Sequence, residues 1–537
     1  MVEDLLSGLN PVQQEIVRDT EGNKLVLAGA GSGKTRVLTH RIAYLLEQGI
    51  QPWQILAVTF TNKAAKEMKA RVVSLSGAPA RDVWIGTFHG ICIRILGRFG
   101  SDIGIDKFTI IDDKEQKTIL KGLLEQIGGD YEVDTIKSVI SNAKNGLLTP
   151  ADLLGESNHQ HEKDLAHIYQ AYEDKKTEND YLDYDDCIMK VVHLFNVSES
   201  ARDQYQHQFR YVMTDEVQDT NKAQFKLLSQ LSGHYENLFA VGDSDQSIYK
   251  WRGAEIKNII NFGTFFPNAK LYKLEQNYRS SGTIVAASNA VVANNKERLD
   301  KTAFTDQDMG DPVVIYQADD DGREADFVTQ VIRRMIQVDG AKWNDFAILY
   351  RTNRQSRAIE TSFTQFGIPY QVVGGHAFYD RKEIKDLVGY LRAINNGLDV
   401  LAFNRIINVP KRGIGDASVG RIQDYALECG IPFSKALENV EDVPKIPKKA
   451  LASIKEFVTM MDKFIAFANS EEFSVAELVR LVISETHYLD ALNPDKDEDA
   501  SRMENIEELV NVAGKWDEDT DRETKGLAEF LSETSLV

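Results

Sequence analysis

The chain contains 537 residues, with 62 basic and 82 acidic side chains and a formal net charge of −20. A single hydrophobic core rarely grows beyond ~250 residues, so this length predicts about three or four lobes. The acidic balance by itself argues against a nucleic-acid partner, because such domains are usually basic, and any DNA site must therefore be local.

Signals for secretion, membrane insertion or disulfide formation are lacking in the sequence. The cysteines, Cys92, Cys187 and Cys429, lie far apart without metal or redox spacing, and we expect all of them in the core of a protein of the reducing cytosol. The N-terminus has no signal-peptide layout, and no apolar run approaches the ~18 residues of a membrane helix. We therefore expect a cytoplasmic protein without a membrane partner.

Residues 25–35 read LVLAGAGSGKT, which predicts a buried strand, a glycine-rich turn and the start of a helix. The glycines allow backbone N–H groups to point at one anion, Lys34 adds a positive charge, and Thr35 offers a hydroxyl group to Mg²⁺. The strict pattern GxxxxGK[ST] has glycine where Ala28 stands, and the alternative is an ordinary turn before a helix. We predict that nucleotide phosphates bind to the loop formed by Ala28, Gly29, Ala30, Gly31, Ser32, Gly33, Lys34 and Thr35.

Three segments near this loop also suggest ligand contacts. Gln13 follows Asn10 and Pro11, where its amide can read an adenine edge or simply form part of a helix cap. A predicted strand at Ile55–Phe60 leads into a polar, basic helix start, and Phe60 can stack on a base. A further strand at Val83–Gly86 precedes His89, which is either structural or functional.

Residues 107–187 have a helical pattern without strand signals, which predicts a helical insertion in the sheet domain. The insertion ends in the acidic cluster Asp183, Asp185 and Asp186. Paired carboxylates can bind a metal, but no second cluster is visible, so we interpret these residues as a solvated helix cap.

The sheet pattern resumes at Phe209–Thr214, a strand that delivers Asp215 and Glu216. An apolar strand that ends in Asp-Glu suits phosphate hydrolysis, since one carboxylate can hold Mg²⁺ and the next can orient and deprotonate the attacking water. The alternative is a pair of acidic residues at a sheet edge. Together with the phosphate loop, the pair predicts a nucleotide-hydrolysing site.

Two more predicted strands carry ligand-binding side chains at their ends. Asn237–Val241 precedes Gln246, which can reach a γ-phosphate, and Trp251, which must either pack or stack on a base. Lys270–Leu274 precedes Tyr278, which can stack on adenine, and Arg279, which can act as a charge-stabilising finger. In an open parallel sheet, ligands bind beyond the carboxyl ends of the strands, where all these motifs lie.

The remaining sequence predicts a second α/β lobe and a helical region. Strands are expected at Val313–Tyr316, Phe346–Tyr350 and Tyr370–Val373, with helices at Ala325–Ile336 and Gln355–Phe366. The segments after these strands contain basic and amide side chains that form either a phosphate-backbone track or a solvated face. Those side chains are Arg351, Asn353, Arg354 and Arg357, followed by residues 374–381.

From about residue 383 the pattern is helical throughout. Residues 409–415 resemble a tight turn between two helices whose N–H groups bind a DNA phosphate. The acidic stretch 495–523, which contains Trp516, is expected to be a solvated helical surface.

Eight segments occur in this order along the chain: LNPVQ, AGAGSGKTR, TFTNKAAKEM, GTFHG, DEVQDT, VGDSDQSIYKWRGA, LEQNYRS and YRTNRQSRAIE. The set resembles the superfamily 1 DNA helicases of the UvrD/PcrA/Rep group over essentially the whole chain. The resemblance implies an α/β protein with two RecA-like parallel-sheet motor lobes, each with a helical insertion, and ATP bound between the lobes. The implied parts are 1–107 and 188–276 for the first lobe, 108–187 for its insertion, 277–382 for the second lobe and 383–537 for its insertion.

The resemblance also implies a role for each matching residue. It assigns Gln13, Arg36 and Tyr278 to the adenine nucleotide, Lys34 and Thr35 to phosphates and Mg²⁺, Asp215 to Mg²⁺, Glu216 to the water, and Gln246 and Arg279 to the γ-phosphate. It assigns Phe60, Asn62, His89, Tyr249, Trp251, Arg252, Arg351 and Asn353 to DNA. The implied activity is ATP-driven 3′-to-5′ movement on single-stranded DNA and unwinding at junctions with duplex DNA, in DNA repair or replication and beside proteins of those processes.

Two family segments, T-x-H-x-A-K-G-L-E and a T-R-A segment with a second arginine finger, do not occur in this sequence. We therefore expect a truncated chain that binds ATP and single-stranded DNA but does not unwind duplex DNA. The alternatives are an ATP- and DNA-binding module without unwinding activity, or the helicase part of a recombination helicase–nuclease.

Overall fold

The computed structural model describes residues 2–128, 131–352, 355–373, 379, 381–493, 497–518 and 526–535. The chain divides into two compact units. The larger unit comprises Met1–Gln307 and Phe378–Val537, and the smaller unit is Asp308–Ala377. Among the described residues, no helix has both the length and the apolar character needed to cross a membrane.

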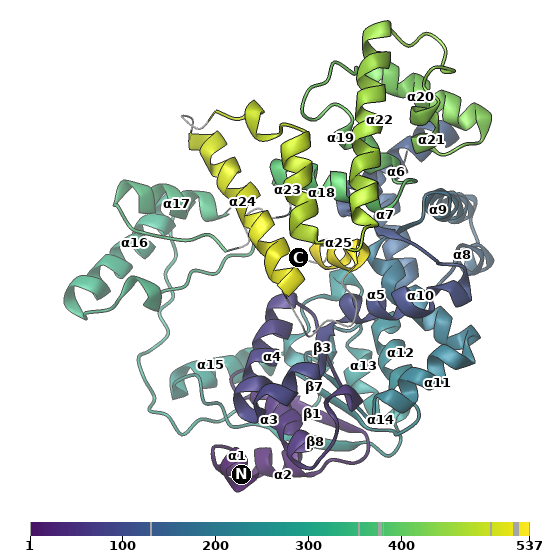
Figure 1. Ribbon diagram of the computed structural model, residues 1–537. Coiled ribbons are helices and arrows are strands. Elements are labelled where there is room, and N and C mark those ends of the chain that lie inside the picture. The colour runs from purple at the N-terminus through teal and green to yellow at the C-terminus, as the bar shows by residue number, and fades with distance from the viewer. Residues whose placement is uncertain are drawn as a thin grey trace. The chain divides into compact units, whose positions relative to one another are not determined.

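A six-stranded sheet with strand order β3-β2-β6-β7-β1-β8 forms the centre of one part of the larger unit (Figure 1). Every pairing in this sheet is parallel. The six predicted strands are confirmed, with bounds that differ by at most two residues, and so is the α/β class. The strands are β1 (Lys24–Ala28), β2 (Ile55–Thr59), β3 (Trp84–Thr87), β6 (Tyr211–Thr214), β7 (Leu238–Gly242) and β8 (Lys270–Leu274).

Alternate residues of the strands enter two separate cores. On β1, Val26 and Ala28 belong to one core, whereas Leu25 and Leu27 belong to the other. Because both faces of the sheet are covered, its central strands are continuous apolar runs and do not alternate with polar residues. The first face is covered by α2 (Pro11–Arg18), α3 (Lys34–Glu47) and α4 (Asn62–Ser76), and the second by α5 (Phe88–Phe99), α10 (Tyr184–Val197) and α12 (Lys222–Leu231).

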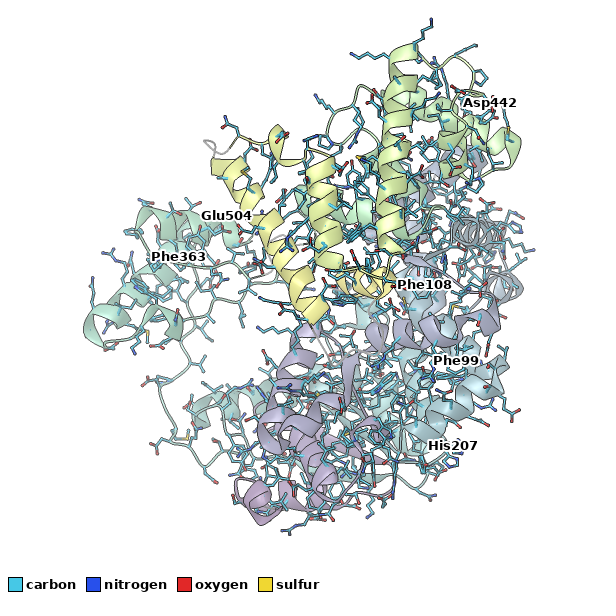
Figure 2. The ribbon with its side chains drawn as sticks, viewed as in Figure 1. Phe99, Phe108, His207, Phe363, Asp442 and Glu504 are labelled. Carbon is cyan, nitrogen blue, oxygen red and sulfur yellow. The ribbon has the colours of Figure 1, made fainter. Side chains whose placement is uncertain are left out.

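Further helices complete the sheet-containing part of the larger unit. They are α1 (Val2–Ser7), α11 (Glu199–Gln208), α13 (Lys257–Ile260), α14 (Phe262–Phe265) and α15 (Gly282–Val292). At the end of α5, the ring of Phe99, which is labelled in Figure 2, meets that of Tyr205 on α11 edge-on, with centroids 5.9 Å apart. This contact holds α11 against the core that contains Leu25 and Leu27.

The first helical insertion has a small core of its own, which includes Leu120, Ile140 and Tyr172. Its helices are α6 (Asp113–Ile127), α7 (Val133–Asn145), α8 (Pro150–Glu156) and α9 (Gln160–Glu178). The expectation of no strand in this region is wrong, because β4 (Thr109–Ile110) and β5 (Tyr181–Leu182) pair in parallel. Strands of two residues are too short to show a period in the sequence.

A second helical region follows residue 381 and has the largest core cluster among the described residues. Its helices, green to yellow in Figure 1, are α18 (Lys382–Asn395), α19 (Val400–Ile406), α20 (Asp416–Cys429), α21 (Phe433–Glu438), α22 (Lys448–Ala468), α23 (Val475–Glu485), α24 (Asp497–Glu518) and α25 (Leu527–Ser535). The expectation of a wholly solvated acidic tail is wrong. Trp516 on α24 is buried against Phe530 on α25, because one side of this acidic helix is apolar and packs into the core.

In its described residues the smaller unit contains the α-helices α16 (Asp321–Val338) and α17 (Ser356–Gln365), which confirm the helices predicted there. Ile332, Phe363 and Ile368 form its core, and Phe363 is labelled in Figure 2.

The three predicted strands of the smaller unit are wrong. Their segments, Val313–Tyr316, Phe346–Tyr350 and Tyr370–Val373, find no strand partner among the described residues. Ile315 and Leu349 are 93% and 95% exposed. An apolar run becomes a strand only when neighbouring strands accept and donate its backbone hydrogen bonds.

Candidate functional site

A glycine-rich loop joins β1 to the N-terminus of α3. Gly31 and Gly33 have φ angles of +71° and +89°, in the left-handed region that favours glycine. Gly31 also has no room for a side chain, since a Cβ there would lie 2.8 Å from both Asn277 Nδ2 and Arg279 Cβ. The first N–H groups of a helix have no partner within the helix, and among the described residues none accepts from the N–H of Gly33 or Lys34. The loop therefore leaves donors open for an anion.

Ala28, at the position where the strict phosphate-loop pattern has glycine, is the last residue of β1. It is fully buried and packs in the core beneath α3. The turn begins only at Gly29, whose carbonyl accepts from Ser32 N and Ser32 Oγ at 3.2 and 2.7 Å. An alanine methyl group therefore fits where no left-handed φ is needed.

Two carboxylates at the end of β6 lie beside the loop. Thr35 Oγ1 donates to Asp215 Oδ2 at 3.2 Å, and Lys34 Nζ pairs with Glu216 Oε2 at 2.7 Å. Glu216 has a φ of +53°, a left-handed conformation that costs free energy for a residue with a Cβ and is typical of functional positions. A hydroxyl group and a buried carboxylate side by side provide the hard oxygen ligands that Mg²⁺ prefers, so these residues fit the cation.

Burial, followed by the nearby charge of Glu216, raises the pKa of Asp215 to about 6. Below this pH a proton competes with Mg²⁺ for the carboxylate. We therefore expect the apparent affinity for Mg²⁺, measured through Mg²⁺-dependent binding of a fluorescent ADP, to fall about tenfold for each pH unit below 6. An affinity that stays level from pH 7 to pH 5 contradicts this assignment.

The same two causes raise the pKa of Asp219 to about 6, so two control variants are needed. In Asp215→Asn, the pH dependence of the Mg²⁺ affinity that comes from the protein should disappear, and only the part that comes from the nucleotide phosphates should remain. Asp219→Asn should behave like the parent chain, because its carboxylate makes no contact with Thr35.

The N-terminal residues brace the loop from the side predicted for adenine. Gln13 Nε2 donates to Ser32 O at 3.0 Å, and Asn10 and Gln13 form a reciprocal helix cap. Gln13 is only 2% exposed, and its contacts in this structure are those of a helix cap, which was the alternative to adenine binding. Asn10 Nδ2 donates to the hydroxyl group of Tyr278 at 2.7 Å, while much of the Tyr278 ring stays exposed. Arg36 is exposed on the first turn of α3.

Gln246 and Arg279 complete the side chains predicted for the phosphates. Gln246 follows β7, and its Nε2 donates to Asp243 Oδ2 at 2.5 Å. Arg279 follows β8 beside Gly31, with an exposed side chain and a backbone N–H that donates to Asn277 Oδ1 at 2.9 Å. Apart from Gln13 on α2, the structure thus places the predicted nucleotide residues after the carboxyl ends of the neighbouring strands β6, β7, β1 and β8, where open parallel sheets bind ligands.

Five side chains at this site were not predicted. Asn277 Nδ2 donates to Ala30 O at 2.6 Å and so ties the loop to the segment after β8. Gln218 Nε2 donates to Glu216 Oε2 at 2.8 Å, and Gln218 Oε1 accepts from Asp243 N at 2.9 Å. Lys301 Nζ contacts Asp243 and Asp245. All except Lys301 lie within segments quoted for the family resemblance, and nothing in the sequence points to Lys301.

An exposed aromatic pair lies on the segment after Gln246. Trp251 is 67% exposed, so the alternative that it packs in a core is wrong. Its ring centroid is 6.3 Å from that of Tyr249, and the Arg252 guanidinium lies 4.7 Å from the Trp251 ring. Exposed rings with an adjacent cation suit the stacking of single-stranded bases.

The other predicted DNA residues are less exposed or lie elsewhere. Phe60 is half-buried with its ring 5.4 Å from that of Phe88, and Asn62 is the first residue of α4. His89 packs edge-on against Tyr184, and burial lowers the pKa of this imidazole to about 4, so it is neutral at pH 7.

The predicted DNA residues of the smaller unit remain predictions. Arg351 is exposed there. Asn353, Arg354, residues 374–378, Asp380 and the side chain of Arg357 lie outside the described residues.

The structure corrects the expectation of a solvated acidic cap at Asp183 and Asp186. Asp183 does cap α10, but both carboxylates are buried. Lys144 and Lys176 pair with them, Lys144 Nζ at 2.6 and 2.7 Å. The two ammonium groups occupy the position that a cation would need, so the cluster is structural.

The expectation that all cysteines lie in the core is wrong. Cys92 and Cys187 are buried, but Cys429 is exposed at the last turn of α20.

The DNA-phosphate contact expected at the turn 409–415 remains a prediction. Asn408 Oδ1 already accepts from Arg412 N at 2.8 Å and from Ile414 N at 3.3 Å. A phosphate at this turn would therefore be bound by other N–H groups of the turn.

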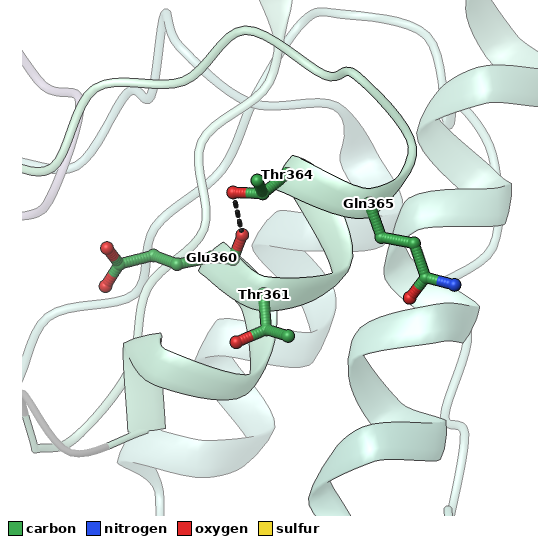
Figure 3. Close-up of a pocket in the computed structure, with 4 residues that line it drawn as sticks. All are labelled: Glu360, Thr361, Thr364 and Gln365. Atoms are coloured by element: carbon green, nitrogen blue, oxygen red, sulfur yellow. Dashed lines mark hydrogen bonds between the residues drawn. The ribbon is translucent and has the colours of Figure 1, made fainter.

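A shallow pocket in the smaller unit is lined by Glu360, Thr361, Thr364 and Gln365 of α17 (Figure 3). Thr364 Oγ1 donates to the carbonyl of Glu360 within the same helix at 2.8 Å. These side chains share one helix and include a single charge, so the pocket does not resemble the nucleotide site.

Comparisons with known proteins agree with this geometry. The UvrD/REP helicase N-terminal domain matches residues 9–267, and the UvrD-like helicase C-terminal domain matches residues 272–537. The chain is 46% identical over 539 residues to a protein named ATP-dependent DNA helicase PcrA from Staphylococcus epidermidis, covering 99% of this chain and 73% of that protein. Its identity to the protein of the same name from Bacillus subtilis is 43% over 540 residues, covering 99% and 72%. The chain therefore belongs to the UvrD/PcrA group of superfamily 1 helicases.

Proposed function

We propose that this chain is a DNA-dependent ATPase of the helicase type, which uses ATP and Mg²⁺ to move 3′ to 5′ along single-stranded DNA and binds the junctions of single-stranded with duplex DNA. One observation carries the proposal. The phosphate loop after β1 pairs with two carboxylates after β6, Gln246 follows β7, the strand between these two, and Gln246 and the exposed Trp251 share one short segment. Nucleotide chemistry and base stacking are thus built into neighbouring parts of one sheet edge. A role in DNA repair or replication, beside proteins of those processes, is part of the proposal.

The residues divide the chemistry of hydrolysis among them. Lys34 and the open N–H groups bind the phosphates, while Thr35 and Asp215 would hold Mg²⁺, which neutralises phosphate charge when bound. Glu216 orients and deprotonates the attacking water. In the structure Lys34 Nζ forms an ion pair with Glu216 Oε2 at a distance of 2.7 Å. Phosphate binding must draw the ammonium group away, and this frees the Glu216 carboxylate for water.

Hydrogen bonds link the carboxylate segment to the aromatic pair. Thr220 O accepts from Glu255 N at 3.0 Å and from Asn258 Nδ2 at 2.9 Å. The segment that carries Trp251 is therefore fixed to the residues directly after Asp219. A change in the carboxylate segment during turnover has a short path to the stacking side chains, which supports coupling of hydrolysis to movement.

The organisation into two motor lobes is also part of the proposal. We assign residues 1–107 and 188–276 to the first lobe, 108–187 to its insertion, 277–382 to the second lobe and 383–537 to the second insertion. Three apolar segments of the smaller unit, Val313–Tyr316, Phe346–Tyr350 and Tyr370–Val373, pair with no strand in the part of the chain that the structure describes. For this reason we expect the 537-residue polypeptide to bind ATP and single-stranded DNA with little unwinding.

The test is an ATPase assay with and without oligo(dT), run beside unwinding assays on 3′-tailed and 5′-tailed duplexes. Stimulation of hydrolysis by oligo(dT) supports the ATPase proposal, and its absence contradicts it. Unwinding of the 3′-tailed duplex alone supports the polarity and overturns the expected inactivity. Tight ATP and DNA binding without any stimulated hydrolysis favours the alternative of a binding module.

We expect Trp251→Ala to lower the affinity for single-stranded DNA by ~1–3 kcal/mol with little dependence on sequence, because each base stacked on an aromatic ring contributes about that much. Fluorescence anisotropy with labelled oligonucleotides of different sequence measures the effect. Trp53→Ala is the matched control, since Trp53 is 52% exposed just before β2. It lies at the amino end of that strand, whereas the predicted ligand-binding residues follow the carboxyl ends of the parallel strands. Equal affinity of Trp251→Ala and the parent chain contradicts the stacking role.

A further inference from the structure

A charged cluster connects the strand end that carries Gln246 to a segment far along the chain. Lys301 Nζ lies 2.5 Å from Asp243 Oδ1 and 2.5 Å from Asp245 Oδ2. Arg298 Nη2 lies 3.2 Å from Asp245 Oδ2, and its contacts do not include Asp243. The side chains of Lys301, Asp243 and Asp245 are only 7%, 4% and 5% exposed.

The Asp243 carboxylate is shared between this cluster and the nucleotide site. Its Oδ2 accepts from Gln246 Nε2, and its Oδ1 accepts from Lys301 and from Asp245 N at 2.9 Å. Asp243 N donates to Gln218, which in turn donates to Glu216. Asp243 is therefore the branching point between the side chain proposed for the γ-phosphate and the side chain proposed as the base.

Lys301 also lies close to the phosphate loop. A Cβ built on Gly29 would be 3.8 Å from Lys301 Cε, which is ordinary packing contact. The ammonium group itself is occupied by the two aspartates. A buried carboxylate that loses its only cation is free to rotate, to take up a proton or to draw the next cation toward itself.

We propose that Lys301 is a positioning residue for ATP hydrolysis: it holds Asp243 in the orientation that aims Gln246 at the γ-phosphate and keeps Gln218 on Glu216. The proposal rests on the proposed ATPase function. Lys301 acts through Asp243, so its removal should impair the transition state more than the binding of ATP. A misplacement of about 1 Å at a catalytic group can lower the rate about 10²-fold.

The test compares Lys301→Met with Lys301→Arg and Arg298→Gln in steady-state ATPase assays with oligo(dT). We expect Lys301→Met to lower kcat about 10- to 100-fold and to change KM for ATP by less than about threefold. Lys301→Arg keeps the charge and should recover most of kcat. Arg298→Gln is the matched control, because it opens the same cluster without touching Asp243, and it should stay within about threefold of the parent chain.

A second readout does not depend on turnover. ADP with aluminium fluoride mimics the transition state and should bind the parent chain more tightly than ADP alone, and Lys301→Met should reduce that ratio by the same factor as kcat. If Lys301→Met does not fold, as judged by its melting temperature, Asp243→Asn should give the same reduced ratio. A change in KM alone, or equal losses in Lys301→Met and Arg298→Gln, overturns the inference.

The two proposals fail in different ways. A parent chain that neither hydrolyses ATP nor distinguishes ADP from its aluminium fluoride complex contradicts the proposed function, and the inference falls with it. If the parent chain hydrolyses ATP and binds the aluminium fluoride complex more tightly than ADP, and Lys301→Met equals it in both respects, only the inference about Lys301 is contradicted.

Discussion

Replacing Glu216 with glutamine is expected to lower ATP turnover ~10²–10⁴-fold, the contribution typical of a general base, while nucleotide binding is retained. Glutamine keeps the size of the side chain and leaves Asp215 and Thr35 in contact. It removes the anion that pairs with Lys34 at 2.7 Å. Because phosphates then need not break this pair, ATP should bind at least as tightly as to the parent chain.

Stopped-flow binding of a fluorescent ATP analogue and single-turnover hydrolysis of radiolabelled ATP measure the two effects separately. Lys34→Ala is the companion variant, since it removes the charge that faces the phosphates but not the base. We expect it to weaken binding strongly. Equal loss of binding in both variants contradicts the division of roles between Lys34 and Glu216.

Replacing Arg279 with alanine is expected to slow hydrolysis ~10³–10⁵-fold, the usual effect of removing an arginine finger. Arg279 lies next to Gly31 of the phosphate loop, with an exposed side chain that is free to swing toward a γ-phosphate. Its backbone is held by Asn277, whose side chain also bonds to Ala30 of the loop. The guanidinium group should therefore stabilise charge that develops during transfer, with a smaller effect on the binding of ATP.

Single-turnover hydrolysis with radiolabelled ATP is sensitive enough to follow this loss. Arg279→Lys is the control variant, because it keeps the charge but lacks the planar fork of donors, and it should recover only part of the rate. Hydrolysis by Arg279→Ala within about tenfold of the parent chain is incompatible with a finger role.

The sheet and the loop were predictable because their signals are local. A central strand of a parallel sheet is buried on both faces, so Leu25–Leu27 and Ile55–Phe60 appear as short apolar runs between polar turns. The phosphate loop needs glycine at Gly31 and Gly33 because both have a left-handed backbone φ, which is a local property of the loop. The residues at strand ends converge because the strands are parallel, and this also follows from the order of elements.

The failures arise where a local pattern needs a distant partner. Val313–Tyr316 has the composition of a buried strand, yet it finds no neighbouring strand among the described residues and stays exposed. Trp516 lies in an acidic stretch, and only the tertiary structure, in which Trp516 packs against Phe530, shows that one side of the helix is a core surface. Composition reports which residues prefer to be buried, and tertiary contacts decide which of them are.

Sequence alone thus determined which residues make up the glycine-rich loop, the carboxylate pair and the aromatic segment, since each is a contiguous motif. The exposure of Trp251 was decided by the tertiary structure. Only the tertiary structure decided how charges are paired. Lys144 reaches Asp183 across 39 residues, and Lys301 reaches Asp243 across 58. Spacing along the chain carries no signal for such pairs, because the free energy that selects them arises only when folding buries both charges together.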